Sequence, residues 1–251
     1  MKRIRKATLA TLAAFALVTT TLAADGPAAA RKERVSFARG AMSATIQGTL
    51  KGDGDVDYLV RAAAGQTLRI EFRASHGQNN FNVLPPGSTN VAMYSSRDTG
   101  ERSCESLLPA DGDYTIRVWL DRPAARRHES SKYTLTVAVS GKPLAPLSAT
   151  QDAKVAGTAY HATATVPCLL PYQPGVKSCD AGVIRRGRDG TATFEAIGRD
   201  GVQRRILFVQ GKPVTADAMA ALTFSRQDDL TTVRIGDDER YDIPDAFLTG
   251  G

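Results

Sequence analysis

The segment that decides the fold class is Tyr114–Leu120, which reads YTIRVWL and has Tyr, Ile, Val and Leu at every second position. A period of two places these side chains on one face of an extended strand. Lys132–Val139 repeats the alternation, and shorter apolar alternations precede both segments from Ala44 onward. Turn residues separate them about every ten positions, which is typical of a β-sandwich. We therefore predict an all-β chain whose N-terminal part is a sandwich of roughly seven or eight strands.

Two stretches without such alternation divide the chain. Gly141–Thr150 (GKPLAPLSAT) contains two prolines, and residues 26–33 are rich in alanine and charged residues. Proline, glycine and small residues without an apolar period are typical of linkers and tails. We predict a β-sandwich domain over 34–142, a linker over 143–150, and a smaller strand-rich domain over 151–251.

The second domain is marked by turn signals. Gly-Arg-Asp-Gly occurs at 187–190 and again at 198–201, and Asp-Gly favours the positive φ angles of a tight hairpin. These turns bracket a predicted strand over Thr191–Ile197. A last hairpin is predicted through Gly236-Asp237-Asp238, and Ala216–Ala221 is predicted to form one short helix.

Residues 1–24 have the pattern of a signal peptide. Four basic residues precede the apolar run Ala7–Ala23, which ends in small residues. The run is shorter and more diluted by threonine than a spanning helix, which needs about 20 strongly apolar residues. We expect cleavage after Ala23 or Ala24, with the alanine run Ala28–Ala30 as the alternative. We also expect no transmembrane segment in the mature chain and a periplasmic or secreted location.

Removal of this signal changes the charge balance. The chain has 32 Lys and Arg against 26 Asp and Glu, so the mature part keeps 28 bases against 26 acids, a net charge of +2. A nucleic-acid partner requires a basic face that neutralises phosphates. Net charge gives no reason to expect such a face, and we predict no nucleic-acid partner.

The cysteines agree with export. Cys168 and Cys179 are close in sequence, among prolines and a glycine, and thiols in an oxidising compartment tend to pair. Zinc is the competing interpretation, but it needs four ligands and this loop offers two. We predict a Cys168–Cys179 disulfide. Cys104 is either a buried thiol or an exposed one that forms an intermolecular bridge.

The sequence shows no signature of catalysis, metal or cofactor binding. None of the three histidines has a metal-binding spacing, and there is no G-x-S-x-G motif. We expect His161 to lie on the surface of a strand and His128 in a solvated loop. The acids at positions 53, 55 and 57 fail the calcium-loop pattern, because Tyr58 and Ala64 stand where that loop requires Gly and Glu. We predict no catalytic residues, no metal ligands, no cofactor and no enzyme activity.

One basic segment stands out from this background. Asp121–Glu129 (DRPAARRHE) carries three arginines between the two strands with the clearest alternation. Most charged loops are simply solvated, which is the alternative interpretation. An arginine held on a protruding loop of a stiff frame is also suited to pair with a carboxylate of another protein. We therefore predict a hairpin loop that presents arginines to an acidic target.

The motifs around this loop resemble a known family. They are Asp57-Tyr58, Ala64-Gly65-Gln66, Leu68-Arg69-Ile70, Phe81-Asn82-Val83, Pro85-Pro86-Gly87, Leu108–Val118 and Arg122-x-x-x-Arg126. With these motifs Gly54–Val139 resembles the periplasmic inhibitors of goose-type (g-type) lysozyme and, more broadly, the pre-peptidase C-terminal β-sandwich modules of secreted peptidases. The second domain resembles uncharacterised exported proteins of Gram-negative bacteria, and no activity comes with that resemblance.

The family resemblance implies a role for individual residues. In those inhibitors a loop enters the lysozyme cleft near its catalytic glutamate, so the resemblance implies that Arg122 and Arg126 are binding anchors and that Tyr58 makes a supporting contact. Pro123, Arg127 and the whole second domain depart from the family pattern. The main hypothesis is an exported binding protein that inhibits g-type lysozyme. The alternative is an accessory or adhesion protein of the cell envelope that binds a glycan or another protein.

Overall fold

A computed structural model describes residues 31–171, 173, 175, 177–198 and 203–250. The predicted signal peptide at 1–24 lies outside the described residues. The chain is all-β, as predicted. The helices of the described part are α1 (Ser96–Thr99), α2 (Arg122–Arg126) and α3 (Asp245–Thr249), each of five residues or fewer. No helix in the described ranges is long and apolar enough to cross a membrane.

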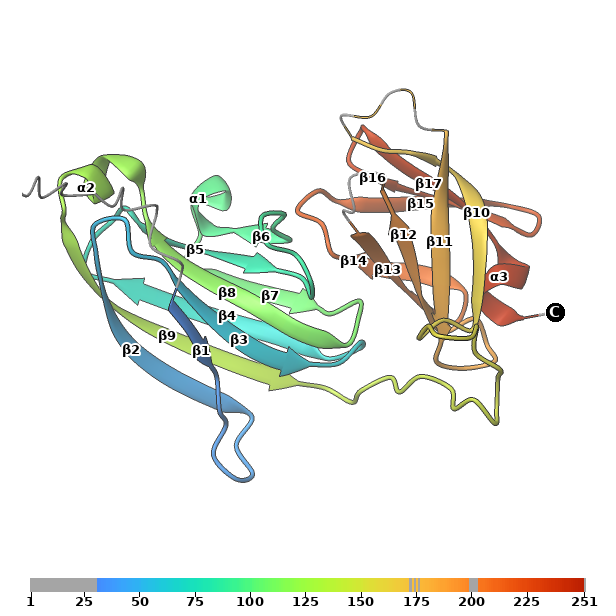
Figure 1. Cartoon of the computed structure of the whole chain (residues 1–251), viewed down its shortest axis with the longest axis horizontal. Coiled ribbons are helices and arrows are strands. Elements are labelled where there is room, and N and C mark those ends of the chain that lie inside the picture. Colours follow the sequence, from blue (N-terminus) through green and yellow to red (C-terminus); the bar gives the residue numbers. More distant parts are fainter. Residues whose placement is uncertain (1–30, 172, 174, 176, 199–202, 251) are drawn as a thin grey trace, which may run out of the picture.

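The first half of the chain forms a sandwich of two sheets (Figure 1). A five-stranded sheet has the order β1-β3-β8-β5-β6, and a four-stranded sheet has the order β2-β9-β4-β7. The strands are β1 (Arg31–Arg34), β2 (Ser43–Lys51), β3 (Val56–Ala62), β4 (Thr67–Ala74), β5 (Asn79–Leu84), β6 (Tyr94–Ser95), β7 (Ser103–Leu107), β8 (Gly112–Leu120) and β9 (Ser130–Ser140).

The period-two pattern explains how the two sheets pack. On β8 the alternate residues Tyr114, Ile116 and Val118 are fully buried, and on β9 Leu135 and Val137 are fully buried from the opposite sheet. Their polar neighbours along each strand face outward, because successive side chains of a strand point to opposite faces. The predicted sandwich is confirmed in its architecture.

Two strands of this sandwich have no apolar signal in the sequence. Residues 31–33 fall in the stretch expected to be a charged tail, but Arg31–Arg34 form β1, which pairs in parallel with β3. Arg34 fastens β1 to β8 by donating two hydrogen bonds to Asp113, of 3.0 and 2.8 Å. β7 pairs with β4 and buries Cys104, so the first of the two alternatives for this thiol is correct. Burial raises the pKa of the Cys104 thiol, and a hydrogen bond with Ser106 opposes that shift.

The second half of the chain forms one eight-stranded sheet with its own apolar core. The order is β14-β13-β12-β11-β10-β17-β16-β15, and the sheet rolls so that its two edge strands come close to each other. The strands are β10 (Ala162–Leu169), β11 (Ser178–Arg185), β12 (Ala192–Ile197), β13 (Gln203–Val209), β14 (Lys212–Ala216), β15 (Leu222–Gln227), β16 (Leu230–Ile235) and β17 (Glu239–Pro244).

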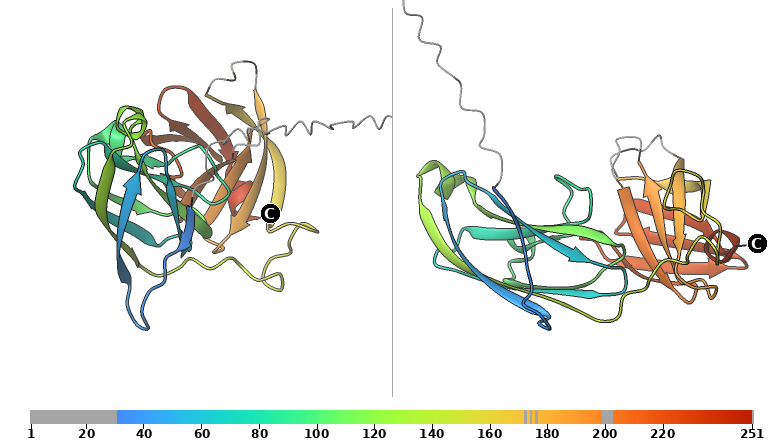
Figure 2. Two further views of the ribbon diagram at one scale, coloured as in Figure 1. Left: turned by 60° about the vertical axis from the view of Figure 1, so that its left-hand side comes forward. Right: turned by 60° about the horizontal axis from the view of Figure 1, so that its bottom comes forward.

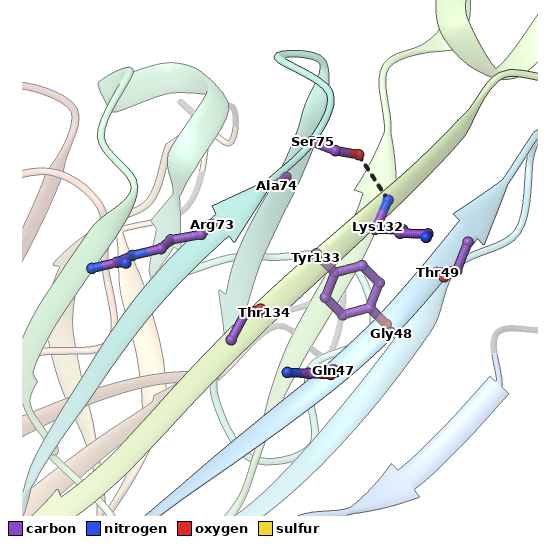
Figure 3. A pocket seen from close by; sticks show the side chains of 9 residues that line it. All are labelled: Gln47, Gly48, Thr49, Arg73, Ala74, Ser75, Lys132, Tyr133 and Thr134. Carbon is purple, nitrogen blue, oxygen red and sulfur yellow. Dashed lines mark hydrogen bonds between the residues drawn. The ribbon is translucent and has the colours of Figure 1, made fainter.

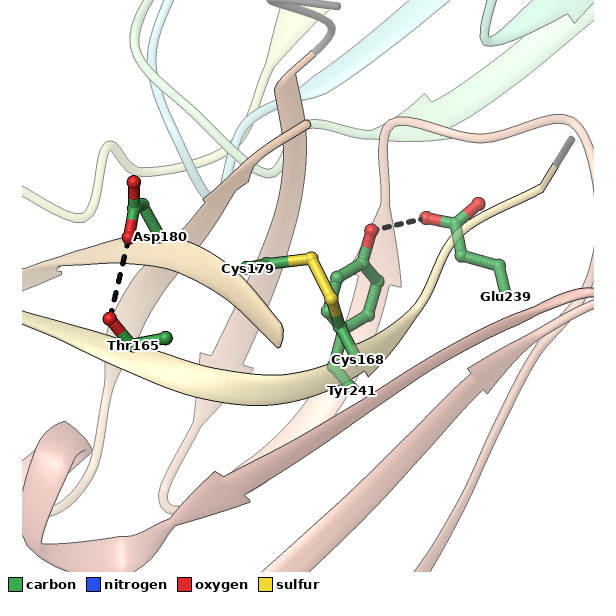
Figure 4. The surroundings of a disulfide bond; sticks show 6 residues. All are labelled: Thr165, Cys168, Cys179, Asp180, Glu239 and Tyr241. Atoms are coloured by element: carbon green, nitrogen blue, oxygen red, sulfur yellow. Dashed lines mark hydrogen bonds between the residues drawn. A yellow bond between two sulfur atoms is a disulfide. The ribbon is translucent and has the colours of Figure 1, made fainter. Parts of the chain in front are cut away.

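The predicted disulfide is present. Cys168 on β10 and Cys179 on β11 are bonded, with Cα atoms 5.8 Å apart (Figure 4). Both half-cystines are buried, and they lie beside Tyr241, whose hydroxyl donates to Glu239 over 2.8 Å. The bridge therefore ties neighbouring strands together at the edge of the second core.

Two predictions for the second domain are wrong. Residues 216–221 do not form a helix: β14 ends at Ala216 and a bend follows. The reason is Asp217, whose fully buried carboxylate accepts from the backbone N–H of Arg205 and pairs with Arg204 and Arg205 at 3.2 Å each. The predicted turn at 198–201 lies almost wholly outside the described residues.

His161 is the second correction. It is only 7% exposed, so it is not a surface residue. Its Nδ1 accepts from the backbone N–H of Arg185 over 3.0 Å, and its Nε2 lies 3.0 Å from the carbonyl oxygen of Leu147. The imidazole thus fastens the segment after the first domain to β11.

The two halves lie against each other, joined by an extended segment (Figure 2). Leu144 donates its backbone N–H to Ala64, and Arg186 donates to both the Leu144 carbonyl and the Asp111 carboxylate. The Thr193 hydroxyl also donates to the Pro109 carbonyl over 2.7 Å. We propose that 143–150 is a linker between a first domain (34–142) and a second domain (151–251). Leu144 of this linker makes hydrogen bonds to both of them.

Candidate protein-binding site at the end of the sandwich

The predicted arginine loop is a single helical turn, α2, between β8 and β9 (Figure 1). Pro123 stands in its first turn, where a fixed φ favours the helical conformation and the missing N–H costs nothing. Ala124 and Ala125 are 0% and 3% exposed and belong to the core of the first domain. The methyl side of α2 is therefore packed onto the sandwich, and the turn cannot move as a free loop.

The exposed side of α2 carries the arginines. Arg122 and Arg126 are exposed, and among the described residues neither has an acidic partner at ion-pair distance. Arg127 differs, because its Nε lies 2.5 Å from Glu129, which also contacts His76 at 2.6 Å. The hydrogen bond from Arg127 lowers the pKa of the Glu129 carboxyl. Two of the three arginines are thus unpaired within the described chain. His128 is exposed, as expected, and adopts a positive φ of 54° where α2 ends.

A hollow of about 570 Å³ lies beside α2. Arg122 lines it together with residues from the five-stranded sheet and neighbouring loops: Asp53, Asp55, Arg97, Arg117 and Trp119. The guanidinium of Arg97 lies over the Trp119 ring, 5.8 Å from its centre. The indole Nε1 of Trp119 and the Oδ1 of Asn82 are buried here and find no hydrogen-bond partner in the described part of the chain.

The charges of this hollow are held in place by the strand pair β3–β8. Arg117 donates from Nε and Nη2 to the buried carboxylate of Asp57, over 2.7 and 2.9 Å. Burial raises the pKa of the neighbouring Asp55, and the positive charge of Arg117 opposes that shift. Asp53 and Asp55 therefore line the hollow, and Asp57 anchors Arg117, which lines it as well. Within the described residues no group of three potential ligands is placed to hold a metal ion.

The structure corrects the expectation for Tyr58. Its side chain is 1% exposed, and its hydroxyl lies 2.7 Å from that of Tyr133 inside the core. A residue that points into the sandwich cannot supply a direct contact to a partner surface. The sequence motif Asp57-Tyr58 marks a strand that supports the hollow, since Asp57 on its other face anchors Arg117.

Sequence reasoning missed three members of the site: Arg97, Arg117 and Trp119. Arg117 and Trp119 lie on the outer face of β8, and the alternate residues of this strand face the core. A bulky Trp on the outer face of a half-buried strand was a signal that could have been used. Arg97 lies on α1, whose position against β5 cannot be read from the local sequence pattern.

Comparison with known proteins decides the family. No family model matches the chain. The inhibitor of g-type lysozyme from Escherichia coli (strain K12) is 31% identical over 144 residues, which cover 55% of this chain and 98% of that protein. The chain belongs to the family of g-type lysozyme inhibitors. The suspected family is thereby confirmed, and the family match leaves nearly half of the chain outside it.

Solved structures give further similarities to the inhibitor-family domain. PliG of Aeromonas hydrophila, a periplasmic lysozyme inhibitor of g-type lysozyme, is 33% identical with a TM-score of 0.41, over 44% of this chain and 96% of that one. The pre-peptidase C-terminal domain of a collagenase from Bacillus anthracis is 15% identical with a TM-score of 0.31, over 46% of this chain and 99% of that one. The protein is periplasmic or secreted, like the relatives in this family.

Proposed function

We propose that this protein inhibits a g-type lysozyme, and that Arg122 and Arg126 of α2 are the residues that enter the enzyme's acidic cleft. The Escherichia coli and Aeromonas hydrophila relatives named above are inhibitors of g-type lysozyme. The observation that supports the assignment of Arg122 and Arg126 is that α2 has one buried side and one exposed side. Its alanines are buried in the core, while both arginines are exposed and unpaired within the described residues.

The helical turn gives the two arginines a common direction. Residues four apart in a helix lie on the same face, about 5–6 Å apart at Cβ. Arg122 and Arg126 are therefore adjacent, which suits two neighbouring carboxylates or one carboxylate held from two sides. A guanidinium pairs bidentately with a carboxylate, and the pair strengthens when an interface excludes water.

The hollow beside α2 extends the proposed interface. Because Arg122 lines it, a partner that covers α2 also covers Trp119 and Arg97. Tryptophan and arginine are the residue types that most often contribute strongly to protein interfaces. The partner we propose is thus a protein, and the action is binding rather than catalysis.

The proposal is tested with the mature full chain in a cell-wall lysis assay against g-type, c-type and i-type lysozymes. We expect inhibition of the g-type enzyme. Arg122→Ala and Arg126→Ala should each weaken it by about 30-fold, the effect of a typical interface anchor. Arg127→Ala is the matched control: it removes the same group from the same turn, but one already paired with Glu129.

Thermal unfolding is measured for all three variants, and we expect no change because the side chains are exposed. A g-type lysozyme that stays fully active at micromolar excess of the protein would overturn the proposal. Inhibition that survives the double substitution at 122 and 126 would overturn the residue assignment alone.

A further inference from the structure

The outer face of the four-stranded sheet carries a second hollow, also of about 570 Å³ (Figure 3). Six outward side chains line it: Gln47, Thr49, Arg73, Ser75, Lys132 and Thr134. The set contains two cations, three hydroxyls and an amide, and no acid. None of these residues belongs to the site at α2.

Strand register arranges the lining side chains in two rows. In the first row Gln47 of β2 lies opposite Thr134 of β9, which lies opposite Arg73 of β4. In the second row Thr49 lies opposite Lys132, whose backbone N–H donates to the Ser75 hydroxyl over 3.0 Å (Figure 3). Each row therefore contains one cation and two neutral hydrogen-bonding groups. Rows two residues apart along a strand are separated by about 7 Å.

The part of the chain that the structure describes does not neutralise the two cations. Arg73 and Lys132 are exposed, and neither makes an ion pair with any described residue. The nearest acid along β4 is Glu71, which pairs with Arg69 at 3.1 Å. A neighbouring hollow of about 650 Å³ is lined by Arg69, Arg73 and Arg102 and by one acid, Glu71. The adjoining surface therefore carries more cations than acids.

The floor of the hollow is rigid because Gly48 and Tyr133 interlock. A side chain at Gly48 would place its Cβ 2.3 Å from the Tyr133 ring and hydroxyl. Only glycine lets this ring pass under β2 and reach Tyr58 in the core. The packing of Tyr133 against Gly48 therefore restricts the backbone of β2 and β9, from which the lining side chains project.

We propose that this face binds an anionic glycan, an extended sugar chain that carries carboxylates. The two cations match carboxylates, and the flanking hydroxyls and amide match sugar hydroxyl groups. Single-stranded nucleic acid is a poorer match, because it is usually held by exposed aromatic rings. The one ring here, Tyr133, is 3% exposed. A periplasmic or secreted protein also meets sugar polymers more often than nucleic acid.

The proposal is tested by calorimetric titration of the mature full chain with an oligogalacturonate. A maltooligosaccharide of equal length and an oligothymidylate of equal charge serve as comparison ligands. We expect the oligogalacturonate to bind at least about tenfold more tightly than either. The double variant Arg73→Gln/Lys132→Gln should weaken its binding by about tenfold or more. Thr134→Val should weaken it by a few-fold, because it removes a hydroxyl without changing charge.

A control variant with the same loss of charge is Arg61→Gln/Lys212→Gln, whose residues are exposed on other strands. We expect less than about a twofold change in its affinity, since distant surface charges are screened by salt. Absence of saturable binding at millimolar ligand overturns the proposal. So does unchanged affinity of the Arg73/Lys132 variant, or equally tight binding of the oligothymidylate.

This inference is independent of lysozyme inhibition, and the variants separate the two. Arg73→Gln/Lys132→Gln should retain the inhibition measured for the unmodified chain. Arg122→Ala/Arg126→Ala should retain glycan affinity. If inhibition fails altogether, the titration still decides glycan binding by itself.

Discussion

The hydroxyls of Tyr58 and Tyr133 lie 2.7 Å apart in the core of the first domain. Tyr58 belongs to β3 of the five-stranded sheet and Tyr133 to β9 of the four-stranded sheet, so their hydrogen bond joins the two layers. The rings meet edge to face with centres 6.5 Å apart. Burial raises the pKa of Tyr133, and the hydrogen bond with Tyr58 adds to the shift. Tyr133 therefore keeps its proton at physiological pH.

We predict that Tyr58→Phe destabilises the protein by about 1–2 kcal/mol, because it leaves the Tyr133 hydroxyl buried without its partner. The double variant with Tyr133→Phe should cost less than the sum of the two single changes, since no polar group is then left unpaired. Urea unfolding measures both. Lysozyme inhibition should be unchanged in Tyr58→Phe. Lost inhibition at full stability would show that Tyr58 contacts the partner after all.

Arg186 and Asp111 form an ion pair between the two domains. The side chain of Arg186 is fully buried, and its Nη1 lies 3.0 Å from Asp111. Burial lowers the pKa of Arg186, and the charge of Asp111 opposes that shift. Asp111→Ala should therefore destabilise the protein by about 3 kcal/mol, the effect of stranding a buried charge.

The same change should expose the linker at 143–150 to proteolysis, because Leu144 is held by Arg186. Limited proteolysis and thermal unfolding check both effects. Asp238→Ala, in an exposed turn, is the control. Equal behaviour of the two variants would show that the domains do not depend on this contact.

The attachment of β1 should depend on pH. The hydrogen bond from Arg34 lowers the pKa of the Asp113 carboxyl below its usual value of 3.8. A carboxyl with a lowered pKa stabilises the folded state above its unfolded pKa, and this contribution is lost as pH falls through the folded pKa. Asp113→Asn should thus lower Tm slightly near pH 6 and have no effect in strong acid. Because the pair is largely exposed, the difference should also shrink at high salt. A difference in Tm that grows with acidity would contradict this account.

Removal of the disulfide should weaken the second domain selectively. Cys168 and Cys179 close a loop with a sequence separation of 11. Replacing both with Ser should cost about 2–3 kcal/mol in the chain-entropy account. Denaturant unfolding measures this loss, and Cys104→Ala, which alters a buried thiol of the first domain, is the control. Lysozyme inhibition should persist, and its loss would show that the second domain takes part in it.

Much of the fold could be predicted because it depends on local alternation. The strands around Tyr114–Leu120 and Lys132–Val139 are paired and buried as their period of two indicates. The hairpin through Gly236-Asp237-Asp238 and the disulfide also follow from local chemistry. These features share one property: the residues that determine them are neighbours in the sequence.

Other features could not be predicted because they depend on distant partners. β1 has no apolar alternation and exists through backbone pairing with β3 and the contact of Arg34 with Asp113. His161 appeared to be a surface residue, but a backbone segment 14 positions away covers it. The stretch after Ala216 has helical composition, and the buried ion pairs of Asp217 override it.

The amino-acid sequence by itself determined the all-β class and the pairing of Cys168 with Cys179. It also predicted an export signal and singled out the arginine-rich segment Asp121–Glu129 as a candidate binding site. The tertiary structure alone decided that Arg122 and Arg126 stand exposed on a pinned helical turn, that Tyr58 is a core residue, and that Arg73 and Lys132 meet on one sheet face. The physical reason is that alternation specifies which side of a strand is apolar. It does not specify which strand becomes its neighbour, and register across strands is what brings separate charges together.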